Sequence, residues 1–159
     1  MAVSISATTR PPRPHEIDGT HYHFLTHDQF DALIAADGLL EWAEFNGERY
    51  GTPWRSVEAA LATGRPVVLE IDVQGARQVR ANYPEAVLVF LTAPSEEELR
   101  KRFARRGSET DQQVATRLRI AQWELAQAGE FDHQIVNDDL GRTVTELNRI
   151  IDQMPARSS

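Results

Sequence analysis

The hydrophobic pattern of residues 1–65 predicts short strands joined by turns and small helices. The segments VSIS, HYHFL and LLEWAEF show the polar–apolar alternation, or the aromatic content, of half-buried strands. NGERYG follows the third strand, and its Asn46-Gly47 pair is a strong short-range signal for a hairpin. We therefore expect this part of the chain to form a lobe rich in hairpins.

Two short helices are expected in the same lobe. The segment from Thr26 to Gly38 predicts the first, which opens with a capping box formed by Thr26 and Gln29. Gly38 is expected at the C′ position, just past the end of this helix. A second helix is expected to begin at Trp54 and to stop at Gly64.

After residue 65 the pattern changes, because nearly unbroken apolar segments predict strands that are buried on both faces. Three such strands are expected, in PVVLEIDV, AVLVFL and HQIVN. Helices are expected over residues 78–83, 95–107, 112–128 and 143–154. In the third of these helices, Val114, Leu118 and Leu125 are expected to face inward. Alternating strands and helices predict the α/β class with a parallel core sheet.

Composition narrows the function. The chain has 159 residues, which favours one domain. Its net charge of −7 argues against duplex nucleic acid as a partner, since the phosphate backbone favours basic surfaces. No segment has the length of a membrane span, so no membrane partner is expected. The chain has no cysteine, which excludes disulfides and thiolate zinc sites and fits a cytoplasmic protein.

Arginine dominates the basic residues, since Lys101 is the only lysine among 17 basic side chains. The planar guanidinium fork suits phosphate, although a GC-rich genome gives the same bias. The five histidines show no spacing typical of a metal site and are expected to be structural or surface residues.

The segment SISATTRPPRP carries two arginines next to a hydroxyl cluster. Arg10 and Arg13, beside Thr8 and Thr9, could hold an anion, or the segment could be a solvated loop stiffened by prolines. RPPRP also matches a polyproline II ligand of an SH3-type domain, but the strand expected before it argues against that interpretation.

Three further groups of residues have both a functional and a structural interpretation. Glu70 and Asp72 lie at the end of a predicted strand. Carboxylates at this place could hold hydrated Mg²⁺ near polyphosphate or accept hydrogen bonds from a base. In the structural interpretation the strand simply ends in polar residues. Arg102 and Arg106 share a helix face and Arg117 follows on the next helix. These arginines could neutralise a transferring phosphoryl group, or form a solvated face balanced by the acids at 96–98.

Glu41 alternates with Trp42 in LLEWAEF, so one of the two points into the cavity that the strand borders. A buried carboxylate needs hydrogen-bond donors, and guanine offers an adjacent pair, N1–H and N2–H₂, that adenine lacks. Tyr22 and Tyr50 could donate to a phosphate. Each of these residues could instead be an ordinary packing or surface residue.

Taken together, these segments resemble guanylate kinases. The resemblance rests on SISATTRPPRP, DGTHYHFL, LLEWAEFNGERYGTP, VVLEIDVQGARQVR, ELRKRFARRG and QIVNDDL, which occur in the family's order across nearly the whole chain. It implies a P-loop-type parallel sheet core flanked by helices, with an inserted antiparallel GMP-binding lobe and a helical lid. It also implies phosphoryl transfer from ATP, taken with Mg²⁺, to GMP, which gives ADP and GDP.

The resemblance also implies roles for individual residues. Those expected to face the guanine are Ser6, Glu41 and Asp72. Those expected to hold the GMP phosphate are Arg10, Arg13, Tyr22 and Tyr50. Thr52 and Glu70 would support the nucleotide, and Asn137 would lie near the adenine of ATP. The arginines expected on the transferring phosphoryl group are Arg102, Arg106 and Arg117; no residue is expected to ligate a metal directly.

One departure from the family is clear, because the 159 residues contain no GxxxxGK[ST] motif and the only lysine, Lys101, lies in the arginine-rich helix. The expected fold therefore lacks its first strand and phosphate-binding loop, and transfer is expected to be absent or impaired. We favour truncation as the explanation, because the phosphate-binding and lid arginines are all present. The alternative is a non-catalytic module that binds GMP or a phosphopeptide. Four parts are expected: the GMP lobe at 1–65, core strands and helix at 66–95, the lid at 96–128 and the last core elements at 129–159.

Overall fold

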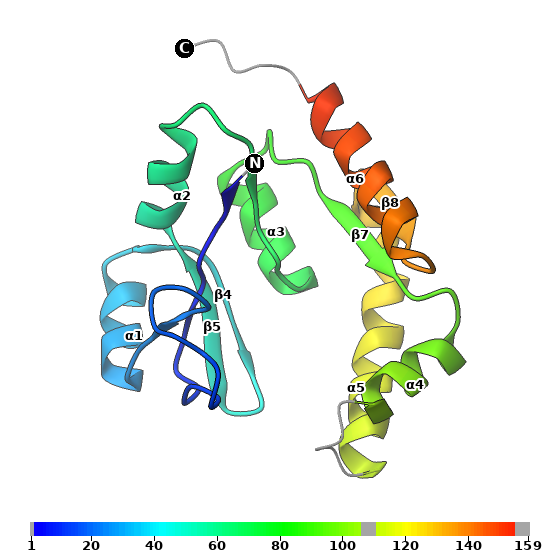
Figure 1. Ribbon diagram of the computed structural model, residues 1–159. Coiled ribbons are helices and arrows are strands. Elements are labelled where there is room, and N and C mark those ends of the chain that lie inside the picture. The colour runs from blue at the N-terminus through cyan, green and yellow to red at the C-terminus, as the bar shows by residue number, and fades with distance from the viewer. Residues whose placement is uncertain (1, 106–110, 155–159) are drawn as a thin grey trace. The chain divides into compact units, whose positions relative to one another are not determined.

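The computed structural model describes residues 2–105 and 111–154 of the chain (Figure 1). The chain forms two compact units, Met1–Ala86 and Val87–Ser159. The division into four parts expected from the sequence is finer than this and stays a prediction. Within the described ranges, no helix is both long enough and apolar enough to cross a membrane.

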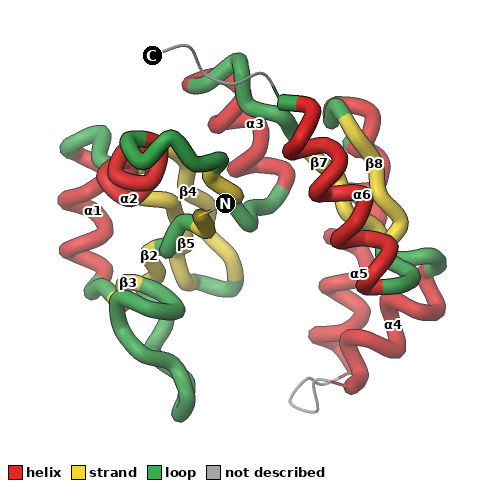
Figure 2. Tube along the Cα trace, turned by 45° about the horizontal axis from the view of Figure 1, so that its top comes forward, coloured by secondary structure: helices red, strands yellow, loops and turns green. Residues whose placement is uncertain are grey.

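The first unit is built on a four-stranded sheet with the strand order β3-β2-β5-β4 (Figure 2). Its strands are β2 (Ala7–Thr8), β3 (His23–Phe24), β4 (Leu39–Phe45) and β5 (Glu48–Pro53). β2 runs parallel to β3, whereas β5 is antiparallel to both β2 and β4. The predicted hairpin is confirmed, because Asn46 and Gly47 join β4 to β5 with φ values of 54° and 79°. Positive φ at both turn residues gives the twist that two-residue hairpins require.

Helix α1 (His27–Ala35) begins with the predicted capping box, in which Thr26 and Gln29 each bond the other's backbone N–H. The prediction for its C-terminal end is wrong by one position. Asp37, with φ 49°, takes the left-handed C′ position, and Gly38 follows it and donates its N–H to the Leu33 carbonyl at 2.8 Å. Aspartate is tolerated at C′ because its short polar side chain enters the left-handed region more readily than most side chains.

The sheet of the first unit has a hydrophobic cluster on each face. Neighbouring residues of β4 supply both, since Leu39 packs with Ala7 and Phe30, and Leu40 packs with Val57 and Val79. The second cluster lies under α2 (Trp54–Leu61) and α3 (Val73–Asn82). The alternation of side chains along a strand thus places β4 between helix layers.

The first predicted strand, VSIS, is largely wrong, because only Val3 lies in a strand and residues 4–6 connect two short strands. β1 (Ala2–Val3) pairs in parallel with β6 (Val67–Val68), and the chain then joins the four-stranded sheet at β2. PVVLEIDV was expected to form a long strand buried on both faces, and that prediction is wrong. β6 is two residues long and half-buried, because its one described partner, β1, is equally short.

The second unit contains a parallel strand pair with helices. Its elements are β7 (Val89–Thr92), α4 (Glu96–Arg105), α5 (Asp111–Ala126), the 3₁₀ turn η1 (Ala128–Glu130), β8 (His133–Val136) and α6 (Leu140–Gln153). Ile135 and Leu118 are buried, as expected, but Leu91 and Val136 are about half exposed. The prediction that both strands are buried on both faces is therefore wrong, and Leu125 of α5 is also exposed rather than inward.

Gly51 of β5 is closely surrounded by other atoms of the four-stranded sheet and its first helix. A Cβ at this position would lie 2.8 Å from the Glu41 carbonyl oxygen, 2.9 Å from Trp42 Cβ and 3.2 Å from a ring carbon of Phe30. We expect Gly51→Ala to lower the free energy of unfolding by about 1–3 kcal/mol, the usual cost of overpacking. Urea unfolding followed by circular dichroism measures this change.

Gly129→Ala is the control for this substitution, because a Cβ at Gly129 would meet nothing within 4 Å. It is expected to change the free energy of unfolding by no more than about 0.5 kcal/mol, as surface substitutions usually do. Equal stabilities of the Gly51 and Gly129 variants would contradict the packing described for β4 and β5.

Candidate functional site

Arg10 lies directly after β2 and is held from several sides. Its backbone N–H donates to Thr8 Oγ1 at 3.1 Å, and its guanidinium lies 5.5 Å from the centre of the Tyr22 ring. Nη1 donates to the Pro11 carbonyl at 2.7 Å, and Nη2 donates to Glu16 Oε1 at 2.9 Å. A guanidinium has five N–H donors, so these two bonds leave donors for a further acceptor.

Glu16 joins the two arginines of the opening segment. While Oε1 accepts from Arg10, Oε2 accepts from the Arg13 backbone N–H at 2.7 Å. The Arg10 hydrogen bond, and then the Arg13 backbone bond, lower the pKa of Glu16 to about 2, and the Glu16 carboxylate raises the pKa of Arg10. The sequence analysis missed Glu16, although its place three residues after Arg13 allowed such a turn. Arg13 itself presents an exposed side chain.

Two tyrosines from segments that are far apart in the sequence lie beside Arg10. The Tyr22 and Tyr50 rings are edge to face with centroids 6.3 Å apart, and Phe24 lies 5.9 Å from Tyr22. Parallel pairing of β2 with β3 and antiparallel pairing of β2 with β5 bring these rings together. The structure thus groups Arg10, Tyr22 and Tyr50 around one end of β2, as an anion site would require.

Glu41 is a buried carboxylate on β4, with 6% of its surface exposed. Thr52, opposite it on β5 and also buried, donates its hydroxyl to Glu41 Oε1 at 2.6 Å. On the other side lies Gly75 of α3, where a Cβ would be 2.5 Å from Glu41 Oε2. Burial is the main reason that the pKa of the Glu41 carboxyl is raised, and the Thr52 hydrogen bond opposes it.

Asp72 caps the N-terminus of α3 next to this carboxylate. Its side chain accepts the Gly75 N–H at 2.7 Å, and its negative charge contributes to the raised pKa of Glu41. The predicted strand therefore ends before both acids: Asp72 lies beyond β6 at the start of α3, and Glu70 is exposed. Ser6 precedes β2, and its carbonyl accepts the His23 N–H at 2.8 Å. Among the described residues, the hydrogen bonds of the Glu41 carboxylate do not include Ser6 or Glu70.

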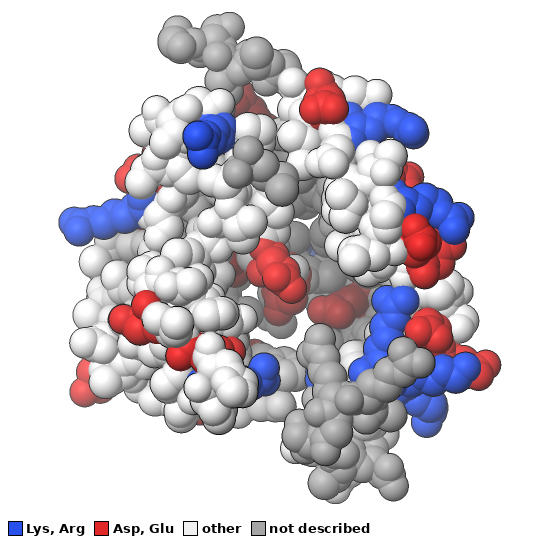
Figure 3. All heavy atoms as spheres, viewed as in Figure 1, with Lys and Arg blue, Asp and Glu red and all other residues white. Residues whose placement is uncertain are grey.

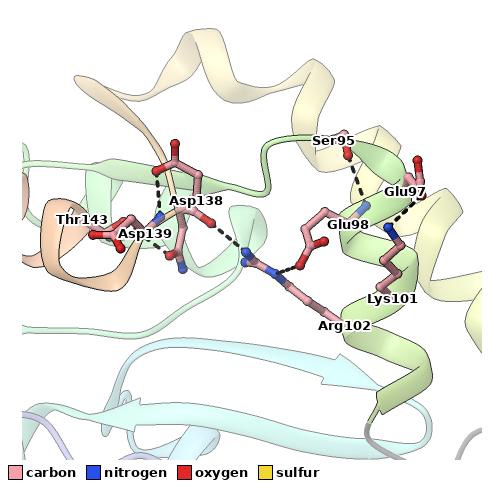
Figure 4. A network of polar contacts seen from close by, with 9 residues as sticks. Ser95, Glu97, Glu98, Lys101, Arg102, Asp138, Asp139 and Thr143 are labelled. Atoms are coloured by element: carbon pink, nitrogen blue, oxygen red, sulfur yellow. Dashed lines mark hydrogen bonds and ion pairs between the residues drawn. The ribbon is translucent and has the colours of Figure 1, made fainter.

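In the second unit, Arg102 connects α4 to the loop after β8 (Figure 4). Its Nη2 donates to the Asn137 carbonyl at 2.8 Å, and its Nε donates to Glu98 Oε1 at 3.4 Å. The Asn137 side-chain oxygen accepts from the Thr143 hydroxyl at 3.3 Å. Two residues predicted from the sequence to act on ATP, Arg102 and Asn137, are thus brought into contact.

Of the other two arginines predicted to contact the transferring phosphoryl group, only Arg117 lies in the part of the chain that the structure describes. Arg117 of α5 has its guanidinium 4.4 Å from the centre of the Phe103 ring. Arg106 lies outside the described residues. The acids at 96–98 fill the first turn of α4 and the basic residues at 100–102 follow in the next, so that Lys101 pairs with Glu97 at 2.7 Å. Figure 3 shows acidic and basic side chains next to one another on the surface of the protein. The negative charges at 96–98 are therefore paired with basic side chains of the same helix, as the structural interpretation expected, and Arg102 also contacts Asn137.

The raised pKa of Glu41 predicts a pH dependence of stability. Between the ordinary glutamate pKa and the higher pKa in the folded state, the folded chain binds more protons than the unfolded chain. The contribution of Glu41 to the free energy of unfolding therefore falls as pH rises through this window and is constant above it. Urea unfolding from about pH 4 to about pH 8 is expected to show this fall in the wild type and its loss in Glu41→Gln.

Glu44→Gln changes an exposed glutamate of the same strand and is the matched control. It is expected to keep the pH dependence of the wild type. If Glu41→Gln and Glu44→Gln give the same pH profile, the buried carboxylate described here is not present in solution.

Comparisons with known proteins identify the family of this chain. The family model described as "Guanylate kinase" matches residues 1–154. Guanylate kinase of Thermosynechococcus vestitus is 50% identical over 151 residues, which cover 95% of this chain and 79% of that protein. Guanylate kinase of Cutibacterium acnes is 53% identical over 152 residues, which cover 95% of this chain and 76% of that protein.

A solved structure agrees with the sequence comparisons. The crystal structure of guanylate kinase from Anaplasma phagocytophilum superposes with a TM-score of 0.81 at 32% sequence identity, covering 97% of this chain and 77% of that chain. The family match, the sequence identity and the shared fold extend over nearly the whole chain. The chain belongs to the guanylate kinase family.

Proposed function

We propose that this chain binds GMP in its first unit and carries the residues with which a guanylate kinase transfers a phosphoryl group from ATP to GMP, a reaction that is impaired in these 159 residues because they contain no phosphate-binding loop. The observation that carries the proposal is the buried Glu41 carboxylate, held by the Thr52 hydroxyl on one side and closed off by Gly75 on the other. A protein rarely buries a carboxylate unless it is hydrogen-bonded, since an unpaired buried charge is costly. A ligand that offers donors would supply the bonds that remain.

Guanine fits this carboxylate better than adenine. An ionised carboxylate is an acceptor with about four lone-pair sites, and Thr52 engages one oxygen at 2.6 Å. The adjacent N1–H and N2–H₂ donors of guanine are matched to the two oxygens of one carboxylate, whereas adenine lacks that pair. In this proposal Thr52 orients Glu41, and Asp72 at the N-terminus of α3 and Ser6 complete the guanine site. Glu70 supports the nucleotide from the segment after β6.

The phosphate of GMP is assigned to the group around Arg10. The remaining N–H donors of Arg10 can form two parallel hydrogen bonds to phosphate oxygens, and the hydroxyls of Tyr22 and Tyr50 can donate to the same group. Arg13 would join them, because Glu16 fixes its backbone at 2.7 Å while its side chain is exposed. Arg10, the two tyrosines and Glu41 all belong to the first unit, Met1–Ala86, which supports assigning them to one nucleotide.

Arginines in the second unit are assigned to phosphoryl transfer. Arg102, Arg106 and Arg117 would neutralise the charge that develops on the transferring group, and Asn137 would lie near adenine. ATP would enter with Mg²⁺, which would help to neutralise the charge of the phosphates; the described residues contain no group of three or more acids and histidines that could hold a metal ion. We also propose a cytoplasmic location, which the absence of cysteine supports.

The base assignment predicts a selective effect of Glu41→Gln. The amide keeps an oxygen for the Thr52 hydroxyl but turns one acceptor for guanine into a donor that faces a donor. Mispairing at a buried charged site costs about 1–3 kcal/mol or more, so GMP affinity should fall roughly ten- to a hundredfold. Isothermal titration calorimetry with GMP measures the loss.

AMP is the control ligand, because it offers no donor pair to Glu41. Its weak binding should change little in the Gln variant. A variant that binds GMP as tightly as the wild type, or that loses GMP and AMP binding in equal proportion, would exclude Glu41 as the residue that reads the base.

The transfer reaction predicts a requirement for a phosphate-binding loop. The 159 residues contain no GxxxxGK[ST] motif, and arginines are worth about 10³–10⁵ in rate when the polyphosphate is already held in place. A coupled assay of GMP-dependent ADP release should give negligible turnover for these 159 residues. A version extended at its N-terminus by a family-type strand, GxxxxGK[ST] loop and helix should be active.

Replacing the loop lysine of the extended version by alanine is the control, and activity should collapse again. Robust ADP release from the 159 residues alone, dependent on GMP, would show that ATP is held by other means.

A further inference from the structure

Helix α3 covers the outer edge of β4 through side-chain amides. β4 is the last strand of the four-stranded sheet, so the outward backbone groups of Leu40 and Trp42 have no strand to pair with in that sheet. The side-chain amide of Gln78 on α3 forms hydrogen bonds with both the backbone N–H and the backbone carbonyl of Trp42. Its Oε1 accepts the Trp42 N–H at 3.1 Å, and its Nε2 donates to the Trp42 carbonyl at 2.7 Å.

Asn82, one turn further along α3, makes the next contact of this kind. Its Nδ2 donates to the Leu40 carbonyl at 3.0 Å. Four residues along a helix span about 6 Å, and two residues along a strand span about 6.6 Å. β4 has a register shift between Leu39 and Glu41, so its repeat is not fully regular here. The two amides nevertheless hold β4 on both sides of Glu41 and fix the register of α3 on this edge.

Glu41 lies between the two residues that these amides hold. The Leu40 and Trp42 peptide groups on either side of it are both bonded to α3. The same register places Gly75, three residues before Gln78, against Glu41, where a Cβ would be 2.5 Å from Oε2 and 3.2 Å from Ile71 Cβ. The backbone of Glu41 and the space around its carboxylate are therefore both set by the seating of α3.

We propose that Gln78 is a positioning residue for guanine recognition, acting through the Trp42 backbone and α3 on the carboxylate of Glu41. The inference rests on the proposed function. Two parallel hydrogen bonds to N1–H and N2–H₂ require the carboxylate to stay within about 0.5 Å of its productive position. Loss of the Gln78 hydrogen bonds would allow α3 to shift along β4 and would displace the Glu41 carboxylate. We expect the hydrogen bond to the 2-amino group of guanine to weaken first, because it needs the second carboxylate oxygen of Glu41 in place.

GMP and IMP separate this role from a contribution to folding alone. IMP carries N1–H but no 2-amino group, so the ratio of its Kd to that of GMP reports the hydrogen bond between Glu41 and the 2-amino group. A purely structural defect lowers the folded fraction and weakens both ligands by the same factor, leaving the ratio unchanged. A displaced carboxylate lowers the ratio.

The experiment measures both dissociation constants by calorimetry for the wild type and for Gln78→Met, at a temperature where thermal unfolding shows each to be folded. Methionine has a similar length and removes both amide groups. The wild-type ratio is expected to be about tenfold or more, since hydrogen bonds to charged groups are the strong ones. Gln78→Met is expected to lower that ratio at least about fivefold. Gln74→Met, at an exposed position one turn earlier on α3, is the matched control and should keep it.

If the methionine variant does not fold, Gln78→Glu is measured in its place. It keeps an acceptor for the Trp42 N–H, loses the donor to the Trp42 carbonyl, and is expected to lower the ratio as well. An unchanged ratio in the folded Gln78 variants, including an equal loss for GMP and IMP, overturns the inference and leaves the proposed function intact. Failure of the wild type to bind GMP, or to prefer GMP over IMP, would instead overturn the proposed function itself.

Discussion

The burial of one carboxylate constrains the whole first unit. A charged group removed from water must be given donors or enough space for a ligand that brings them, and its pKa rises until it receives them. Glu41 takes one donor from Thr52 on the neighbouring strand and is closed in by Gly75 on α3. β5 and α3, far apart in the sequence, are both needed to form its surroundings.

The arginines show a complementary constraint. Arg10 in the first unit and Arg102 in the second unit each pair with a nearby glutamate, Glu16 at 2.9 Å and Glu98 at 3.4 Å. Both pairs are partly buried at the surface, where an ion pair contributes little to stability, so their main effect is to limit where a long side chain can point. An arginine oriented before its ligand arrives loses less side-chain freedom on binding. Both units thus hold their cations in place with acids from the same local segment.

The parts of the fold that the sequence predicted are those with local causes. The Thr26–Gln29 capping box and the Asn46-Gly47 turn are each determined by a few adjacent residues. The length of β6 was overestimated because strand length depends on partners, and its one described partner, β1, is two residues long. Leu125 was misplaced because one helix pattern is compatible with several rotations, and packing selects one.

In the candidate site, too, the sequence identified residues marked by local features and missed those whose role depends on distant contacts. Residue type and the order of segments resembling guanylate kinases pointed to Glu41, Arg10 and the tyrosines, because carboxylates and guanidinium groups have specific uses in binding a base or a phosphate. Glu16 and Gln78 were missed since their roles depend on contacts with backbone groups. Gln78 bonds a residue 36 positions away in the chain, and no local pattern marks such a contact.

The most direct test of this account is the pKa of Glu41 measured in the free and the GMP-saturated chain. Carbon-13 NMR of the glutamate side-chain carboxyls, with the Glu41 signal assigned by its loss in Glu41→Gln, gives both values. The account predicts a raised pKa in the free chain and a clear fall when GMP binds, because donors to the charged form favour it. A Glu41 pKa that is unchanged or higher in the presence of saturating GMP would contradict the central claim that this buried carboxylate receives the guanine donors.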